Sequence, residues 1–262
     1  MIRPSLFLLV VAACSSALDE PPPMSTLAPN RANGRSASEL MRDADAAWAR
    51  RAHDGEAAAA QGFYVDAAAA DEHRVDGLLG AMRAITFRIE DEAGAPRSEL
   101  AKQEVELGQW CQRRAPTNPE CDYRLAIALG HNAREHASTG LAAVGKMVEL
   151  LHRAIATGPR LDDGGPHRVL GLLLLRAPSW PIGPGDTGAG LDEARAAIAL
   201  FPDAPPNLLV LGEALEANDA RAEARVAYSK ALARATAARA AGLPEAASWM
   251  TQAQAGIAHA SH

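Results

Sequence analysis

The stretch "PPNLLVLGEALEANDARAEARVAYSKALARATAA", residues 205–238, decides the fold. Apolar and small residues recur in it at helical spacing, in two runs separated by a short polar segment. The first run is Leu208, Leu211, Gly212 and Leu215, and the second is Ala224, Tyr228 and Ala231. Glycine and alanine let two helices cross closely, and a tyrosine fills the gap toward a following pair. The stretch therefore predicts two antiparallel helices packed as one unit.

The spacing of this unit recurs upstream. In the preceding unit, Ala194 is followed by Ala197 three residues later and by Pro202 five residues after that. One unit earlier, Ala154 is again followed by a proline five residues later, Pro159. Ala197 lies 34 residues before Ala231, and Ala154 lies 43 residues before Ala197, so about nine extra residues separate the earlier units. The 34-residue period resembles the tetratricopeptide repeat (TPR). The resemblance implies a right-handed α-solenoid with a concave surface.

Composition supports an all-α fold. Aromatic residues make up only 4% of the chain and alanine is abundant, which favours helices over strands. We expect about five antiparallel helix pairs and a C-terminal capping helix. The predicted pairs span 38–53 with 56–70, 73–91 with 97–114, 121–135 with 138–157, 166–176 with 188–200 and 206–217 with 220–238, and the cap spans 245–259. At the front, Tyr64 has alanines at the repeat spacing, but Trp48 stands where a small residue is expected.

The N-terminus carries an export signal. The apolar run "LFLLVVAA", residues 6–13, is too short to span a bilayer as a helix and is typical of a secretory signal. It ends in "VAAC", which resembles the lipobox of bacterial lipoproteins. The resemblance implies that residues 1–13 are removed and that Cys14 carries a lipid. Ser15 follows, not Asp, and by the same resemblance this implies the outer membrane, on its periplasmic side. The alternative is an ordinary signal peptide with an incidental cysteine.

Residues 14–37 follow the signal. They are polar, rich in proline and serine, and lack a periodic apolar pattern. Such a composition predicts a flexible tether that connects the lipid to the folded domain. We expect that domain to occupy residues 38–262.

Two further cysteines, Cys111 and Cys121, flank a proline-containing connection between two predicted helices. An exported protein meets an oxidising compartment, which favours a disulfide between them. The bridge would join the end of one helix to the start of the next. The alternative is two free, buried thiols.

Several chemistries are disfavoured. The formal net charge of -6 and the lack of a basic stripe argue against nucleic-acid binding. His131 and His136 are five residues apart, so one helix does not point both at the same metal ion, and we expect them on a polar helix face. No nucleophile elbow or phosphate-binding loop motif occurs in the sequence. We expect no cofactor, no metal site and no enzymatic activity.

The glycines of "PIGPGDTGAG", residues 181–190, match the spacing of a dinucleotide-binding fingerprint. That site requires a strand before the first glycine. The upstream segment is instead an apolar helical run broken by prolines, so the glycines are predicted to form a turn. Asp186 or Thr187 is expected to cap the helix that follows.

The same segment is a long connection within one predicted repeat, and it accounts for the extra length between units. Long ordered loops are often functional, and we single out Arg176, Trp180 and Asp186 as candidates for contact with a partner or ligand. Trp180 lies between two prolines. It is expected to plug the repeat core, and the alternative is an exposed contact.

The stretches "YRLAIALG", "GPHRVLGLLLLRAPSWPIGPGD" and "LDEARAAIALFPDAPPNLLVLGEAL" together resemble the TatT-like family, the T components associated with some TRAP transporters. The resemblance implies a periplasmic, lipid-anchored repeat protein that partners a substrate-binding subunit in the uptake of small organic molecules. A second hypothesis is a repeat scaffold that binds envelope proteins and no small molecule. Both use the concave surface of the solenoid.

Overall fold

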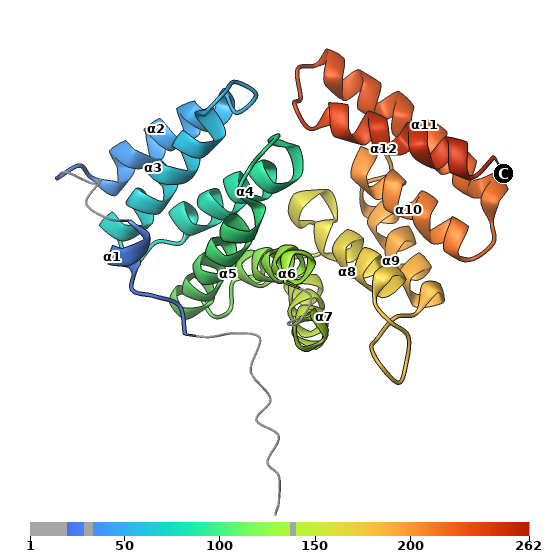
Figure 1. Cartoon of the computed structure of the whole chain (residues 1–262), viewed down its shortest axis with the longest axis horizontal. Helices are drawn as coiled ribbons and strands as arrows, with labels where there is room; N and C mark the ends of the chain where they lie inside the picture. Colours follow the sequence, from blue (N-terminus) through green and yellow to red (C-terminus); the bar gives the residue numbers. More distant parts are fainter. Residues whose placement is uncertain (1–19, 29–33, 137–139, 262) are drawn as a thin grey trace, which may run out of the picture.

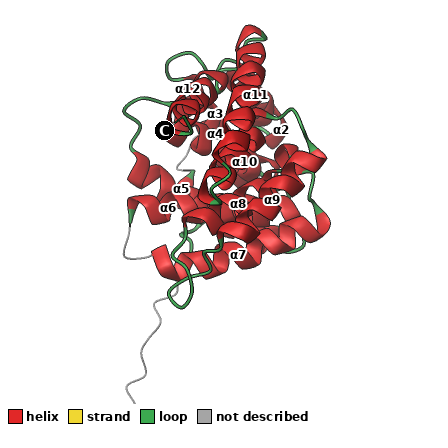
Figure 2. Cartoon of the chain, turned by 90° about the vertical axis from the view of Figure 1, so that its right-hand side faces the viewer, coloured by secondary structure: helices red, strands yellow, loops and turns green. Residues whose placement is uncertain are grey.

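The computed structural model describes residues 20–28, 34–136 and 140–261. Within these residues the chain forms twelve α-helices and one 3-10 helix, and none of them forms a β-strand (Figure 1; Figure 2). The prediction of an all-α fold is confirmed. The predicted signal peptide and Cys14 lie outside the described residues.

The helices follow one another in pairs, at nearly the predicted boundaries. The pairs are α2 (Ala37–Ala49) with α3 (Glu56–Ala70), α4 (Asp76–Asp91) with α5 (Arg97–Arg114), α6 (Pro119–Glu135) with α7 (Gly140–Thr157), α8 (Gly165–Arg176) with α9 (Thr187–Leu200), and α10 (Pro205–Ala217) with α11 (Arg221–Ala240). A short helix α1 (Met24–Leu27) precedes them, the 3-10 helix η2 (Leu161–Asp163) precedes α8, and α12 (Ala246–His259) ends the solenoid.

Local sequence signals set several helix starts. The Ser36 side chain accepts from the backbone of Glu39, and the Glu39 carboxylate accepts from the backbone of Ser36, which makes a capping box before α2. Asn118 caps α6 at the backbone of Glu120, next to a proline in the first turn. These caps satisfy backbone donors that the helix itself leaves unpaired.

The pairs stack so that their first helices form an inner layer. Helix α4 packs on α6, α6 on α8, α8 on α10 and α10 on α12, and the ring of Trp48 on α2 meets that of Phe87 on α4 edge to face at 5.8 Å. Each second helix packs between its partner and the first helix of the next pair. The result is an arch in which α4, α6, α8 and α12 border the inside (Figure 1).

Tyrosines seated on glycines recur along the stack. A Cβ atom added at Gly212 would come within 2.5 Å of the Tyr228 ring, and one added at Gly256 within 2.6 Å, so this ring lies between two glycines of α10 and α12. The Tyr64 ring lies on Gly80 in the same way, at 2.6 Å. At these positions the close approach of ring and backbone requires glycine.

The buried side chains form two clusters that meet at α8. The first extends from α2 to the start of α8, and the second extends from α9 to α12. Leu173 and Leu174 of α8 pack on the first cluster, while Leu172 and Leu175 pack on the second. Helix α8 therefore joins two halves of the solenoid.

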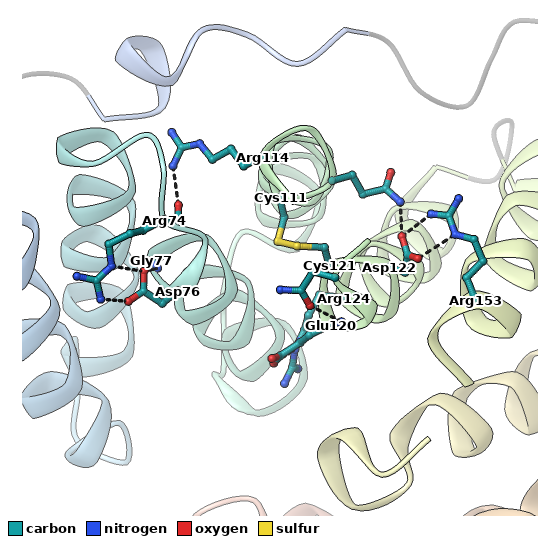
Figure 3. The surroundings of a disulfide bond; sticks show 12 residues. Arg74, Asp76, Gly77, Cys111, Arg114, Glu120, Cys121, Asp122, Arg124 and Arg153 are labelled. Atoms are coloured by element: carbon teal, nitrogen blue, oxygen red, sulfur yellow. Dashed lines mark hydrogen bonds and ion pairs between the residues drawn. A yellow bond between two sulfur atoms is a disulfide. The ribbon is translucent and has the colours of Figure 1, made fainter. Parts of the chain in front are cut away.

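A disulfide joins Cys111 and Cys121, both fully buried, and so ties the last turn of α5 to the first turn of α6 (Figure 3). Beside it, Arg114 donates from Nη1 to the carbonyl oxygens of Ala68 and Asp71, at 2.9 and 3.2 Å. These carbonyls belong to the end of α3, where a positive charge complements the helix dipole. The end of α5 is thus connected to both neighbouring pairs.

The prediction of a flexible tether is wrong for residues 20–28. Trp110 of α5 donates from its indole nitrogen to the carbonyl of Pro22 at 2.9 Å, and Arg113 forms an ion pair with Glu20 at 3.2 Å. Met24 and Leu27 pack on the first core. The composition of the segment does not predict this, because the two apolar side chains, the hydrogen bond and the ion pair all depend on α5 and on the core, which lie far along the sequence.

Candidate binding surfaces

The inner layer contains a buried ionic cluster between α4, α5 and α6. His131 Nδ1 lies 2.6 Å from Glu104 Oε2, and its Nε2 lies 3.4 Å from Glu90 Oε1. Thr86 donates to the other Glu104 oxygen at 2.6 Å. Burial by itself would lower the pKa of His131, but the two carboxylates outweigh it and raise the pKa to about 9. His131 is therefore a buried imidazolium at neutral pH.

Sequence reasoning placed His131 on a polar helix face, and this is wrong. The residue is 4% exposed because Glu104 of α5 offers it a carboxylate inside the repeat stack. His136 lies just after α6 and contacts the Ser98 hydroxyl at 3.1 Å, so the two histidines do not meet a common ligand. The part of the chain that the structure describes contains no group of three or more His, Cys, Asp or Glu side chains placed to hold a metal ion.

Glu90 of α4 is the solvent-exposed member of this cluster. Its side chain is 51% exposed. Burial would raise the pKa of Glu90, but the hydrogen bond to His131 and the positive charges of His131, Arg134 and Arg168 lower it below its usual value. These charges come from α6 and α8, so neighbouring inner helices contribute to the electrostatic environment of Glu90.

A second polar group lies where α6 meets α8. Tyr123 donates to Asp162 Oδ2 at 2.6 Å, and Arg168 donates to the same carboxylate at 2.8 Å and to Asn207 Oδ1 at 2.8 Å. Arg124 lies beside them, 5.3 Å from the centre of the Tyr123 ring, with Glu120 as its ion-pair partner at 3.6 Å. The Nε atom of Arg124 is buried and has no hydrogen-bond partner among the described residues. No motif in the sequence marks any of these residues as a site.

The two ends of the solenoid are joined. Arg51, in the loop after α2, donates from Nε and Nη2 to the two carboxylate oxygens of Glu245, just before α12, at 2.8 and 2.9 Å. The guanidinium also lies 4.5 Å from the Trp48 ring and 5.7 Å from the Phe87 ring. We call the pair Arg51–Glu245 the clasp. It connects residues 194 positions apart, and Figure 1 shows the two loops facing each other across the opening of the arch.

Two features adjoin the clasp. A shallow cleft of about 510 Å³ lies between the end segments 49–53 and 238–244. Asp91, at the end of α4, has its pKa raised to about 7 by burial and by the charges of Glu90 and Glu245, which Arg51 only partly offsets. The clasp therefore has a carboxyl group beside it that titrates near neutral pH.

The connection between α8 and α9, residues 177–186, is an ordered, protruding loop (Figure 2). Its backbone is held by bonds from Gly185 N to Pro178 O at 2.9 Å and from Asp186 N to Leu174 O at 3.0 Å. Trp180 at its tip is 86% exposed, so the expectation that this ring plugs the repeat core is wrong. Gly171 of α8 and Gly190 of α9 already bring the two helices into close contact, which leaves no space for a ring between them.

The other candidates in this loop have structural partners. Asp186 accepts from the backbone of Ala189 at 3.0 Å, so its prediction as the cap of α9 is confirmed. Arg176 forms a two-bond ion pair with Glu213, each bond 2.7 Å long. A Cβ atom at Gly185 would lie 2.1 Å from the Ala177 carbonyl oxygen, so this glycine serves the close packing of the turn. The segment before it is a helix, which agrees with the interpretation as a turn rather than a phosphate site.

None of the helices in the described ranges is long and apolar enough to span a bilayer.

No protein-family model matches the chain. No curated protein matches it either. Among solved structures, the fold is similar to that of TTC0263, a thermophilic TPR protein in Thermus thermophilus, with a TM-score of 0.63 and 18% sequence identity over 85% of this chain and 99% of that one. A structure of MamA protein aligns with a TM-score of 0.49 and 20% identity over 79% and 95% of the two chains. The first similarity shows a TPR-like α-solenoid fold.

Proposed function

We propose that this protein is a non-enzymatic scaffold, anchored to the periplasmic side of the outer membrane through Cys14, that holds a protein partner against the inside of its arch. The observation that carries the proposal is the pairing of exposed charges of opposite sign on neighbouring inner helices, Glu90 on α4 and Arg134 on α6, with the largely buried Arg168 of α8 close enough to act on Glu90. Glu90 of α4 is half exposed and lies in the field of Arg134 on α6 and Arg168 on α8. Charges of both signs on one concave face suit a partner that presents a complementary pattern.

The clasp also favours binding of a partner to the inside of the arch. It joins the ends of the arch through a two-bond pair that is largely screened from water, with side-chain exposures of 13% and 21%. Fixed ends limit how far the inner helices spread, so less conformational freedom is lost when a partner binds. A preorganised concave face is what a scaffold requires.

The partner site is tested by photo-crosslinking in cells. A photoreactive residue at position 90 or 134, on the inside, should capture a defined envelope protein, whereas the same residue at position 192 should not. Asp192 is a matched control because its side chain is 81% exposed on α9, a second helix that faces outward. With the captured protein purified, Arg134→Glu should weaken its binding at least tenfold, and Asp192→Lys should leave it unchanged. Equal capture at positions 134 and 192 contradicts the proposal.

The anchor is tested separately. Cys14→Ala should move the protein from the membrane fraction to the soluble fraction, because no acyl chain would remain to hold it. If the variant stays with the membrane, the lipid is not the anchor.

The second candidate is an accessory role in the uptake of a small organic acid, together with a periplasmic substrate-binding subunit. It rests on the sequence resemblance, and the observation in its favour is that Arg124 and Arg168 both act on one carboxylate, that of Asp162, and lower its pKa, since such a pair of arginines suits an anionic ligand. Native mass spectrometry of the purified protein separates the two candidates. A bound organic acid that Arg124→Ala removes favours uptake, and a ligand-free protein that retains its captured partner favours the scaffold.

A further inference from the structure

The tip of the α8–α9 loop displays apolar side chains to solvent. Trp180 and Ile182 are 86% and 66% exposed. The hydrogen bonds at Gly185 and Asp186 hold the loop in place, and Ile182 N donates to Ser179 O at 3.1 Å, so the tip is a rigid projection. The exposure of these side chains does not serve packing of the repeats, because α8 and α9 already contact each other closely through Gly171 and Gly190.

The charged groups at the base of this loop are already neutralised. Arg176 is paired with Glu213, and the Asp186 carboxylate caps α9. The projecting part, residues 178–184, contains no ionisable side chain. An uncharged tip with an indole at its end has the composition that favours the boundary between water and hydrocarbon in a bilayer.

The tip also lies on the same side of the molecule as the described start of the chain. In Figure 1 the loop between α8 and α9 and the residues directly before α1, drawn in dark blue, both lie on the lower side of the arch. The contacts of Glu20 and Pro22 with α5 fix the N-terminal segment there. Cys14 lies six positions before Glu20, a distance of roughly 20 Å at most along a fully extended chain. A lipid on Cys14 therefore keeps this edge near the membrane.

We propose that residues 180–182 insert into the surface of the membrane that holds the Cys14 lipid, as a second contact that orients the arch on the bilayer. The inference rests on the proposed lipid anchor. A bilayer is the occupant that fits, because two side chains at a narrow tip bury far less area than a specific protein interface, which requires about 800 Å² per partner. Membrane anchoring typically combines two weak signals, and the tip supplies the second.

The test uses the full lipidated chain in vesicles of phosphatidylethanolamine and phosphatidylglycerol that contain brominated acyl chains. Bromine quenches only tryptophans that lie in the bilayer. The chain has four tryptophans, and the other three, Trp48, Trp110 and Trp249, are half-buried in the fold. We expect quenching of roughly a quarter of the emission if the four indoles emit equally. Trp180→Phe should abolish the quenching, while the matched control Trp249→Phe should retain it.

Two further measurements complete the test. Acrylamide, a water-soluble quencher, should reach Trp180 less readily with vesicles than without them. Equal bromine quenching in the chain and in Trp180→Phe overturns the proposal, and so does protection from acrylamide that requires an added protein instead of lipid. If the Cys14→Ala variant still binds the membrane, the proposed lipid anchor is wrong. If membrane binding requires Cys14 but bromine does not quench Trp180, only the proposed insertion of the tip is wrong.

Discussion

In the core formed by α2 to α7, the Tyr64 ring packs on Gly80 of the following helix, and in the core formed by α9 to α12 the Tyr228 ring packs between Gly212 and Gly256. The position that corresponds to Gly212 in the first repeat is occupied by Trp48, sixteen residues before its tyrosine in both cases. There Arg83 lies 4.8 Å from the Trp48 ring and 6.0 Å from the Tyr64 ring. One repeat is thus filled by small residues, and the other by an aromatic ring and a cation.

The same contrast extends to the polar groups. The first core holds the disulfide and the buried pair His131–Glu104, whereas the fully buried polar side chain beside the second core is the neutral Asn207, which donates to the carbonyls of Asp163 and Ala197. A TPR-like stack therefore tolerates replacement of its small residues where ionic and covalent links take over the contact between helices. Four measurements test this difference, from the largest expected effect to the smallest.

The largest effect is expected from removing the tyrosine rings. Tyr228→Ala should lower the free energy of unfolding by about 3–5 kcal/mol, because two glycines do not fill the space left behind. Tyr64→Ala should cost about 1 kcal/mol less, since Trp48 and Arg83 are able to close part of the cavity. Urea denaturation followed by circular dichroism measures both losses.

The phenylalanine variants are the controls for the rings. Tyr228→Phe removes the hydrogen bond to Glu216 at 2.7 Å, and Tyr64→Phe removes the one to Asp45 at 2.6 Å together with the one that the hydroxyl accepts from Arg83 at 3.1 Å. We expect a loss of about 1 kcal/mol for each hydrogen bond. If the two alanine variants lose equal free energy of unfolding, Trp48 and Arg83 do not close the cavity that Tyr64→Ala leaves.

The disulfide is expected to stabilise only the first core. Replacing Cys111 and Cys121 by serine together should lower the free energy of unfolding by roughly 3 kcal/mol, from the entropy of closing a loop with a sequence separation of 10 residues. Hydrogen exchange should show the loss at α5 and α6 and leave α10 to α12 protected. Uniform loss of protection along the chain would contradict a separate first core.

The His131–Glu104 pair gives the first core its own pH dependence. The pKa of His131 is raised to about 9 from its ordinary value of 6.5, so its stabilising contribution is complete below pH 6.5 and is lost as the pH rises through 9. We expect the free energy of unfolding to fall by about 2 kcal/mol between pH 7 and 9.5. His131→Gln should remove this dependence. The matched variant His259→Gln, at a side chain that is 83% exposed, should keep it.

The smallest effect is expected at the clasp. A double-mutant cycle of Arg51→Ala and Glu245→Ala should give a coupling energy of about 1 kcal/mol, because the pair is largely screened from water and has two hydrogen bonds. The exposed pair Arg234–Asp203, with side-chain exposures of 49% and 56%, should give less than about 0.5 kcal/mol. Small-angle scattering of Arg51→Ala should show a larger radius of gyration. An unchanged radius would mean that the ends stay together without the clasp.

The helix pairs were predictable because their signals are local. The spacing of Leu208, Gly212 and Tyr228 depends only on helix geometry, and the expected boundaries of α10 and α11 agree with the structure within two residues. The cap at Asp186 was predictable for the same reason, since its acceptor and donor are three residues apart.

The candidate site was largely hidden in the sequence. Glu90, His131 and Arg168 lie on three different helices, and no spacing along the chain relates them. Trp180 was assigned to the core because most large apolar side chains are buried, and nothing in its own segment indicates that Gly171 and Gly190 leave no room for it. The sequence signal for an exposed Trp180 is the presence of a glycine on each side of the α8–α9 connection, Gly171 and Gly190, because glycines allow the two helices to pack closely.

The helices, their pairing and the place of the long loop follow from local sequence, because they depend on hydrogen bonding and packing between residues within one repeat. The meeting of Arg51 with Glu245, the burial of His131 and the exposure of Trp180 depend instead on how the repeats pack on one another. The curvature of a solenoid is the sum of small rotations between successive pairs. Contacts that depend on this sum join residues far apart in the chain, and no local pattern records them.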